Sequence, residues 1–180
     1  MPLQFYKPNK FNTGAACALS INSKGGAVYV EVIKQLTWDE KSECATFYDR
    51  DKKEKGANVK IQLDRDEIGG MIHALLTRKE FKAFHESETQ QTNIVLDLYY
   101  KWDAKAKAYK DDEPPLGFGL SISRKSKENS EKSNFKIPFT FGESVVLIEY
   151  FRFALEKIFS AVYSEDKKRA EERAKSKAPE

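Results

Sequence analysis

Aromatic rings interleaved with lysines carry the most specific chemistry in this sequence. A single strand of nucleic acid is held by rings that stack on its unpaired bases and by cations that neutralise its phosphates. The candidates lie in the N-terminal segment and on predicted strand faces that point away from a core, and they are Lys7, Lys10, Phe11, Tyr29, Lys34, Trp38, Lys60, Tyr99, Lys101 and Lys136. The alternative interpretation is ordinary packing of the rings between sheets and helices, with lysines that are simply solvated.

Residue types that perform catalysis or bind metal ions are scarce. Two cysteines, Cys17 and Cys44, and two histidines, His73 and His85, cannot supply the clustered ligands of a structural zinc site. The sequence contains no Gly-x-Ser-x-Gly, P-loop or Gly-x-Gly-x-x-Gly motif. We therefore expect a protein that is not an enzyme and that needs neither a cofactor nor a metal ion.

Two glycines inside a predicted strand leave two interpretations open. Gly117 and Gly119 alternate with Phe118 and Leu120, so the glycines share the face opposite the apolar side chains. Glycine within a strand marks a bulge or a close approach of another backbone, or else a bare surface on which a nucleotide can lie.

Alternation of apolar and polar residues predicts the strands that must position these side chains. In the first half of the chain the predicted strands are residues 15–21, 27–35, 43–49 and 58–63. A helix then begins after Asp64, because Glu67 follows at the spacing of a capping box and apolar residues recur at helical intervals. A second, short helical piece is predicted through Phe81, Phe84 and His85.

The second half of the chain repeats this order. Strands are predicted at residues 92–102, 116–124 and 135–141, and the longest helix at 144–163. A shift of 76 positions lays residues 59–67 on 135–143 and matches both the alternation and the spacing from cap to glutamate. We therefore expect one domain over residues 1–163, with halves at about 11–88 and 89–163. The charged tail, 164–180, either extends the last helix or frays.

Composition limits the classes of protein and partner. The 180 residues are 40% hydrophobic and 33% charged, which suits one domain with a highly charged surface. The 31 basic and 28 acidic residues leave a net charge of +3, so a nucleic acid would have to meet a local basic surface. No signal or transit pattern and no membrane-length apolar run is found. We expect a cytoplasmic protein without a membrane partner, with association with a nucleoid left open.

The predicted helix over residues 144–163 is apolar on more than one side. Such a helix is either enclosed within the fold or exposes a second apolar side to another subunit, and we favour the subunit interface. The residues expected at this oligomer interface are Leu147, Tyr150, Phe151, Ala154 and Ile158.

Several short segments together resemble a known family. They are residues 54–72, 81–86, 117–122 and 137–155, where a charged turn leads through a strand into a helix and the order of four strands and a helix occurs twice. This pattern resembles the plant Whirly single-stranded DNA-binding proteins and their relatives, the mitochondrial guide-RNA-binding proteins. One departure is the family's Lys-Gly-Lys-Ala-Ala-Leu motif, whose counterpart here, residues 14–20, lacks both lysines. Lys7 and Lys10 could substitute from upstream.

The resemblance implies an α+β fold with two antiparallel four-stranded sheets in a repeated ββββα arrangement. It also implies a homotetramer assembled through its helices, with a strand of nucleic acid running over the sheets of adjacent subunits. The expected function is binding of single-stranded DNA with little sequence specificity. RNA binding or annealing, and a non-catalytic module for protein interactions, are the alternatives.

Overall fold

The N-terminal part of the chain forms a five-stranded antiparallel sheet, which we call the N-terminal sheet. The computed structural model describes residues 2–49, 56–103, 108–109, 112–129 and 131–176. The strands of this sheet are β1 (Leu3–Lys7), β2 (Ala15–Asn22), β3 (Ala27–Asp39), β4 (Cys44–Phe47) and β5 (Asn58–Leu63). The long strand β3 pairs with β2, β4 and β5, and β1 is added at the edge beside β2. Val28, Val30 and Val32 of β3 are buried, so this sheet has one core face.

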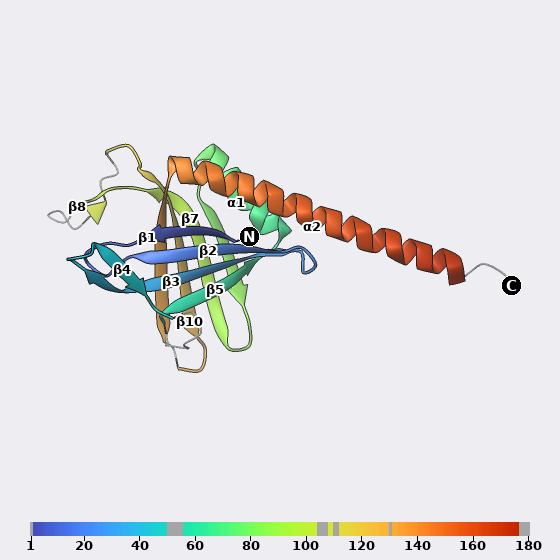
Figure 1. Cartoon of the computed structure of the whole chain (residues 1–180), viewed down its shortest axis with the longest axis horizontal. Coiled ribbons are helices and arrows are strands. Elements are labelled where there is room, and N and C mark those ends of the chain that lie inside the picture. The colour runs from blue at the N-terminus through green and yellow to red at the C-terminus, as the bar shows by residue number, and fades with distance from the viewer. Residues whose placement is uncertain (1, 50–55, 104–107, 110–111, 130, 177–180) are drawn as a thin grey trace.

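The second sheet, which we call the C-terminal sheet, has four antiparallel strands in the order β11-β10-β7-β6. These strands are β6 (Phe81–Glu86), β7 (Gln90–Tyr99), β10 (Gly117–Ser126) and β11 (Lys132–Thr140). A separate small hairpin, β8 (Trp102–Asp103) with β9 (Ala108–Tyr109), lies in the connection between β7 and β10. Figure 1 shows the strands of the two sheets crossing at a large angle, with the sheets face to face.

A helix follows directly on the last strand of each sheet. The helix α1 (Arg65–Thr77) follows β5, and α2 (Phe141–Ser176) follows β11. The first part of α2 packs against α1 and both sheets, and the rest projects well beyond the sheets (Figure 1). Arg78, at the end of α1, lies 4.7 Å from the ring centroid of Phe141, at the start of α2.

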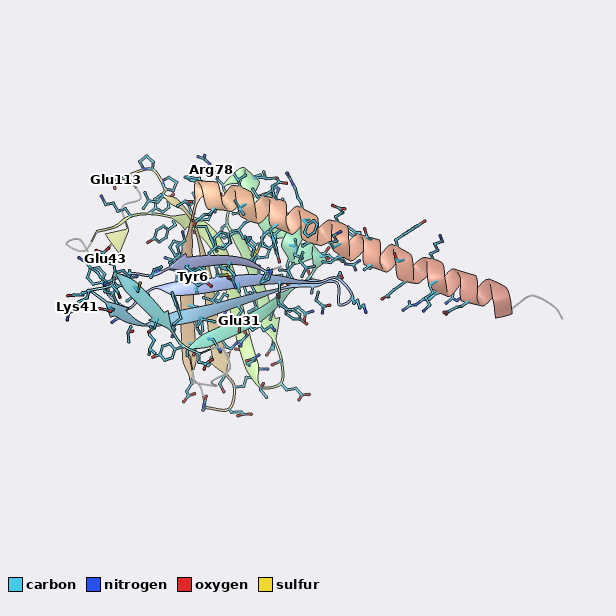
Figure 2. All side chains as sticks on the ribbon, in the orientation of Figure 1. Tyr6, Glu31, Lys41, Glu43, Arg78 and Glu113 are labelled. Atoms are coloured by element: carbon cyan, nitrogen blue, oxygen red, sulfur yellow. The ribbon has the colours of Figure 1, made fainter. Side chains whose placement is uncertain are left out.

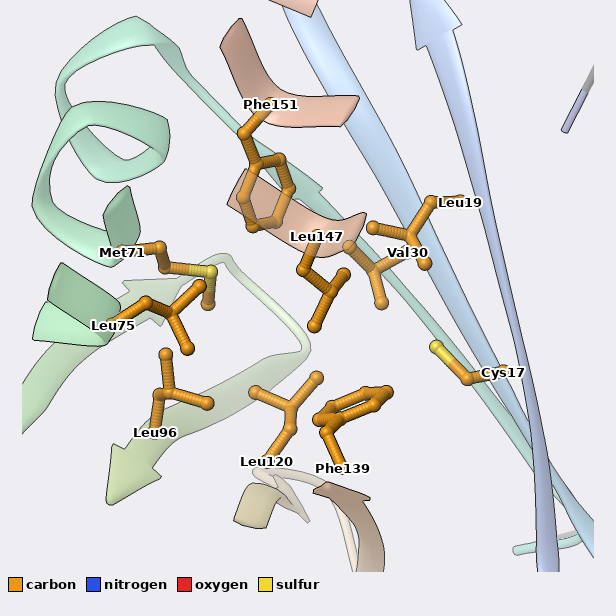
Figure 3. Close-up of a pocket in the computed structure, with 10 residues that line it drawn as sticks. All are labelled: Cys17, Leu19, Val30, Met71, Leu75, Leu96, Leu120, Phe139, Leu147 and Phe151. Carbon is orange, nitrogen blue, oxygen red and sulfur yellow. The ribbon is translucent and has the colours of Figure 1, made fainter. Parts of the chain in front are cut away.

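One apolar core fills the space between the two sheets and the two helices. Figure 3 shows its centre, where side chains from both sheets and both helices converge on a cavity of about 10 Å³. The lining is apolar apart from the Cys17 thiol, so the cavity offers water too few polar partners. Burial, with a smaller effect of Glu31, raises the pKa of Cys17 to about 12, and the thiol stays protonated at neutral pH.

The N-terminus of each helix is joined by one glutamate to an edge strand of the sheet that the helix does not follow. In what we call the α1 clasp, Glu67 accepts a hydrogen bond from the Asp64 backbone N–H and its other oxygen lies 2.6 Å from His85 Nε2 on β6. In the α2 clasp, Glu143 accepts a hydrogen bond from the Thr140 backbone N–H and pairs with Lys7 Nζ on β1 at 2.5 Å. In both clasps the cap residue also accepts a hydrogen bond from the glutamate N–H.

The sequence correctly predicted the fold class, the α1 cap and most strands, but it missed two edge strands. The segment expected to be helical at Phe81, Phe84 and His85 is the strand β6, paired with β7. Phe81 and His85 face inward while Phe84 is exposed, so the period is two and not helical. The strand β1 was not predicted, and it makes the N-terminal sheet five-stranded instead of four-stranded. The helix α2 continues through the charged segment as far as Ser176.

We expect Glu143→Gln to weaken the α2 clasp. Burial alone would raise the pKa of Glu143, but hydrogen bonds from Lys7 and Thr140 outweigh it and hold the pKa below its ordinary value. A carboxyl with a lowered pKa stabilises the fold fully above its ordinary pKa and loses this contribution as the pH falls through the lowered value. The variant should be less stable at pH 7 by about 1 kcal/mol, and its stability should change less on acidification.

Denaturant unfolding between pH 7 and pH 3 measures both effects. The matched control is Glu149→Gln, because Glu149 pairs with Arg152 on the exposed side of α2, where ion pairs contribute about 0–1 kcal/mol. Identical pH profiles of stability for the wild type and Glu143→Gln would contradict a role of this carboxylate in joining α2 to the N-terminal sheet.

Candidate nucleic-acid interface

The outer face of the N-terminal sheet carries a tyrosine covered by a lysine. Tyr29 on β3 lies opposite Gln62 on β5, and Lys60 lies two residues further along β5 on the same face. The Lys60 ammonium is 4.6 Å from the Tyr29 ring centroid. Lys60 is exposed and Tyr29 is half-buried, so solvent reaches the pair.

The outer face of the C-terminal sheet carries a second such pair. The Lys136 ammonium, on β11, lies 5.3 Å from the ring centroid of Tyr99, on β7. Strand β10 runs between them, and Gly119 leaves the space that the lysine stem crosses: a Cβ at Gly119 would lie 3.4 Å from Lys136 Cε and 3.6 Å from Tyr99 Cδ2. A cavity of about 270 Å³ opens here, lined also by Asp97 and Tyr100.

The two glycines of β10 therefore serve different structural purposes. At Gly117 the backbone φ is +156°, and a Cβ would collide with the carbonyl oxygen of Phe139 on the neighbouring strand. This glycine permits a close approach of two backbones. Gly119 instead leaves the space in which the Lys136 side chain reaches the Tyr99 ring.

An aromatic groove lies on the outer face of the N-terminal sheet, over β1, β2 and β4. Its volume is about 210 Å³, and Ala16 and Ala18 leave room between Tyr6, Phe47 and Tyr48. The rings of Tyr6 and Phe47 meet edge to face at 6.0 Å, and Figure 2 labels Tyr6 on this sheet. None of these three rings is among the site residues predicted from the sequence. The signal was present in β2, where small residues alternate with buried ones opposite Tyr6.

A third group of predicted residues lies in the loop between β1 and β2. The Phe11 side chain is 73% exposed, and the Lys10 ammonium lies 5.4 Å from its ring centroid. The loop is held in place by Asn9, whose backbone N–H donates to Gln35 Oε1 at 2.9 Å. Lys10 and Phe11 thus form an exposed ring and cation on a fixed loop.

Four predicted residues do not join these groups. Lys7 is held by Glu143 in the α2 clasp, and the Lys34 ammonium covers the buried ring of Phe135 at 4.8 Å, so both have contacts within the fold. Trp38 is half-buried beside Ala45 in the β3–β4 pair, and Lys101 is exposed just beyond the end of β7. The predicted residues that the structure brings together are Tyr29 with Lys60, Tyr99 with Lys136 and Lys10 with Phe11, and the first two pairings were not predicted from the sequence.

The residues expected at the oligomer interface lie inside the protomer. Leu147, Phe151, Ala154 and Ile158 are at most 3% exposed, and the half-buried Tyr150 donates a hydrogen bond to the Leu19 carbonyl at 2.9 Å. This corrects the expected interface, because α2 packs against α1 and both sheets and the core covers more than one side of it. The large apolar side chains that α2 does expose are Val145, Val146, Phe153, Phe159, Val162 and Tyr163.

Throughout the part of the chain that the structure describes, no group of three or more His, Cys, Asp or Glu side chains is placed to hold a metal ion. Over the same residues, no helix combines the length and the apolar character needed to cross a membrane.

We expect Gly119→Val to separate Lys136 from Tyr99, because the branched side chain would fill the space that the lysine crosses. Nuclear Overhauser contacts between the Lys136 methylenes and the Tyr99 ring should be present in the wild type and lost in this variant. Gly119→Ala is the matched control, since its Cβ meets both side chains at ordinary contact distance. Valine suits a strand, so stability should change by no more than about 1 kcal/mol. Contacts that survive in Gly119→Val would show that the missing side chain at Gly119 is not what allows Lys136 to reach Tyr99.

Comparison with known proteins rests on structure. No protein-family model matches the sequence, and no curated protein matches it. WHY1 from Arabidopsis thaliana is similar in structure, with a TM-score of 0.62 and 15% identity over 100% of this chain and 95% of that chain. The plant transcriptional regulator PBF-2 has a TM-score of 0.59 at 15% identity, covering 93% of this chain and 86% of that one.

A third similar structure is a guide-RNA-binding protein complex bound to a guide RNA. Its TM-score is 0.51 at 14% identity, covering 86% of this chain and 89% of that one. At such identities the likeness concerns the fold. The chain therefore has the Whirly-like α+β fold, with two antiparallel sheets and a C-terminal helix, that the sequence resemblance implied.

Proposed function

We propose that this protein binds single-stranded nucleic acid across the outer faces of its two sheets, with little sequence preference and without catalysis. The observation that carries the proposal is the tyrosine covered by a lysine on each outer face, Tyr29 with Lys60 and Tyr99 with Lys136. Both lysines stand on the last strand before a helix, 76 positions apart in the repeat.

The energies favour exchange of the lysine for a base. A cation over an exposed ring contributes about 0.5–1 kcal/mol. A base stacked on an aromatic ring contributes about 1–3 kcal/mol, and every base has a face that can stack. A base can therefore take the ring face while the displaced ammonium turns to a phosphate. The aromatic groove of Tyr6, Phe47 and Tyr48 offers further rings on the N-terminal sheet.

The comparisons support this choice of partner. One similar structure holds a guide RNA and another is a plant transcriptional regulator, so this fold serves proteins that work on nucleic acid. Single-stranded DNA is the proposed ligand. RNA binding or annealing is the second candidate, supported by the guide-RNA complex.

The first test is the double variant Lys60→Glu with Lys136→Glu, titrated with oligo-dT, oligo-U and duplex DNA. Wild type should prefer single strands to duplex of equal length, because stacking needs unpaired base faces. The variant should bind about tenfold more weakly, and its salt slope should fall by about 1.4, since each phosphate contact on a single strand contributes about 0.7.

The control for this test is Lys24→Glu with Lys79→Glu, which changes net charge equally at exposed positions outside the two outer faces. The control should bind as wild type does. Equal affinity of the wild type for duplex and single strand would reject stacking as the mechanism. Tighter binding of oligo-U than of oligo-dT would favour the RNA candidate.

We also propose that copies of the chain associate through the apolar residues that α2 exposes. Phe153 is 48% exposed and Phe159 is 55% exposed, on a helix that projects beyond the sheets (Figure 1). Exposed apolar patches of this kind mark contact surfaces. The homotetramer implied by the sequence resemblance is the proposed assembly.

Replacing Phe153 and Phe159 by glutamate should dissociate the oligomer without unfolding the protomer, because charge opposes burial in an apolar contact. Sedimentation velocity measures the state, and Leu76→Glu on α1, also an exposed apolar position, is the control. A wild-type chain that sediments as a monomer would refute the proposed assembly.

A further inference from the structure

Arg124 stands where the open edge of the N-terminal sheet meets the C-terminal sheet. Its Nε donates to Thr92 Oγ1 on β7 at 3.2 Å, and Nη2 donates to the Lys60 carbonyl on β5 at 2.8 Å. Among the described strands β5 pairs with β3 alone, so this guanidinium joins the sheets at their seam. Two of its five N–H donors are used in these bonds.

The charge of Arg124 is not balanced by a carboxylate within the described part of the chain. The side chain is half-buried, and burial lowers its pKa, although a guanidinium remains protonated. Withdrawing a cation from water is unfavourable unless an anion or several hydrogen bonds compensate. The two neutral acceptors, a hydroxyl and a carbonyl, compensate only in part.

Two cavities flank this guanidinium, and their charges differ. The larger, of about 290 Å³, is also lined by Glu128 and Glu131 and so disfavours an anion. The smaller, of about 160 Å³, is lined by Lys60 as well as Arg124, and exceeds the roughly 10–15 Å³ that one water needs. An anion should therefore enter the smaller cavity, which we call the seam cavity.

The other ionisable residues of the seam cavity are already paired. His85 lies 2.6 Å from Glu67 in the α1 clasp. Glu86, the one described carboxylate that lines the seam cavity, pairs with Lys127 at 2.7 Å and accepts a hydrogen bond from Gln91 at 3.1 Å. These contacts, the Lys127 pair first, lower the pKa of Glu86 by stabilising its charge. Lys60 and Arg124 thus give the cavity a positive balance.

We propose that the seam cavity is a phosphate-binding subsite, in which Arg124 and Lys60 hold one phosphate of the strand whose base stacks at Tyr29. Lys60 both covers the Tyr29 ring and lines the seam cavity, so the ring and the subsite are adjacent. The planar fork of an arginine presents parallel donors that match two phosphate oxygens. This inference rests on the proposed function and names a contact within it.

The first measurement uses the wild-type chain and nuclear magnetic resonance of the arginine Nε–H groups. Oligo-dT should shift the Arg124 signal, and inorganic phosphate should shift it at higher concentration, while the Arg152 signal stays in place. Arg152 is exposed and pairs with Glu149 on α2, so it reports non-specific effects. An Arg124 signal that neither probe moves would overturn the subsite, whether or not any variant folds.

The second measurement compares Arg124→Gln and Arg124→Lys with Arg152→Gln in titrations with oligo-dT. Both Arg124 variants should bind several-fold more weakly, since lysine keeps the charge but loses the fork. In Arg124→Gln the salt slope should fall by about 0.7, the value of one phosphate contact on a single strand. Thermal melting checks that each variant is folded, and Arg124→Lys serves if Arg124→Gln is not.

The outcomes separate this subsite from the proposed function. Unchanged affinity in folded Arg124→Lys and Arg124→Gln, with tight binding of oligo-dT, would overturn the subsite and leave single-strand binding standing. A shift with inorganic phosphate in a chain that binds no oligonucleotide would overturn the strand as the source of the phosphate, and single-strand binding with it.

Discussion

Two carboxylates connect the two crossed sheets, and each does two tasks at a junction between strand and helix. Glu67 and Glu143 each close the cap of a helix and bind a basic side chain on an edge strand of the opposite sheet. The strand, the helix start and the opposite edge are thus fixed relative to one another by a few hydrogen bonds. The two crossed sheets share one apolar core, so each sheet leaves its other face to solvent.

In the proposed function, those outer faces let a chain with a net charge of only +3 bind a polyanion. The basic residues of the proposed site, Lys60, Lys136 and Arg124, lie singly, beside a ring or at the contact between the sheets, and do not form one basic patch. Lys60 belongs to both settings, since its ammonium covers Tyr29 while its carbonyl holds Arg124. Ring, cation and guanidinium are therefore neighbours near the place where the open edge of the N-terminal sheet meets the C-terminal sheet.

The sequence predicted what local pattern controls and missed what distant contacts control. Alternation located β2, β3 and β5, and the capping spacing located α1, because these signals lie within a few residues. Strand β6 was mistaken for a helix because Phe81 and Phe84, three residues apart, suit a helical face as well as an edge strand with weak burial.

For the site residues, too, local pattern was predictive and distant contacts were missed. Alternation correctly placed Tyr29 and Lys60 on strand faces that point away from the core. Lys7 was predicted to contact nucleic acid because the sequence does not show its partner in the fold, Glu143, which is 136 residues away. The apolar residues of α2 suggested a subunit contact because the sequence does not show how much of a helix its own core can enclose. Arg124 gave no signal at all, since only the meeting of two sheets makes its position unusual.

The two clasps also determine whether fragments of the chain could fold separately. Each sheet with the helix that follows it contributes a glutamate to one clasp and a basic residue to the other, and the α1–β6 connection around Arg78 is short. A chain cut in that connection would give two fragments of similar design, neither of which holds a complete clasp. Each fragment would find its missing partners only in the other, so the two would fold by complementation and not as independent modules.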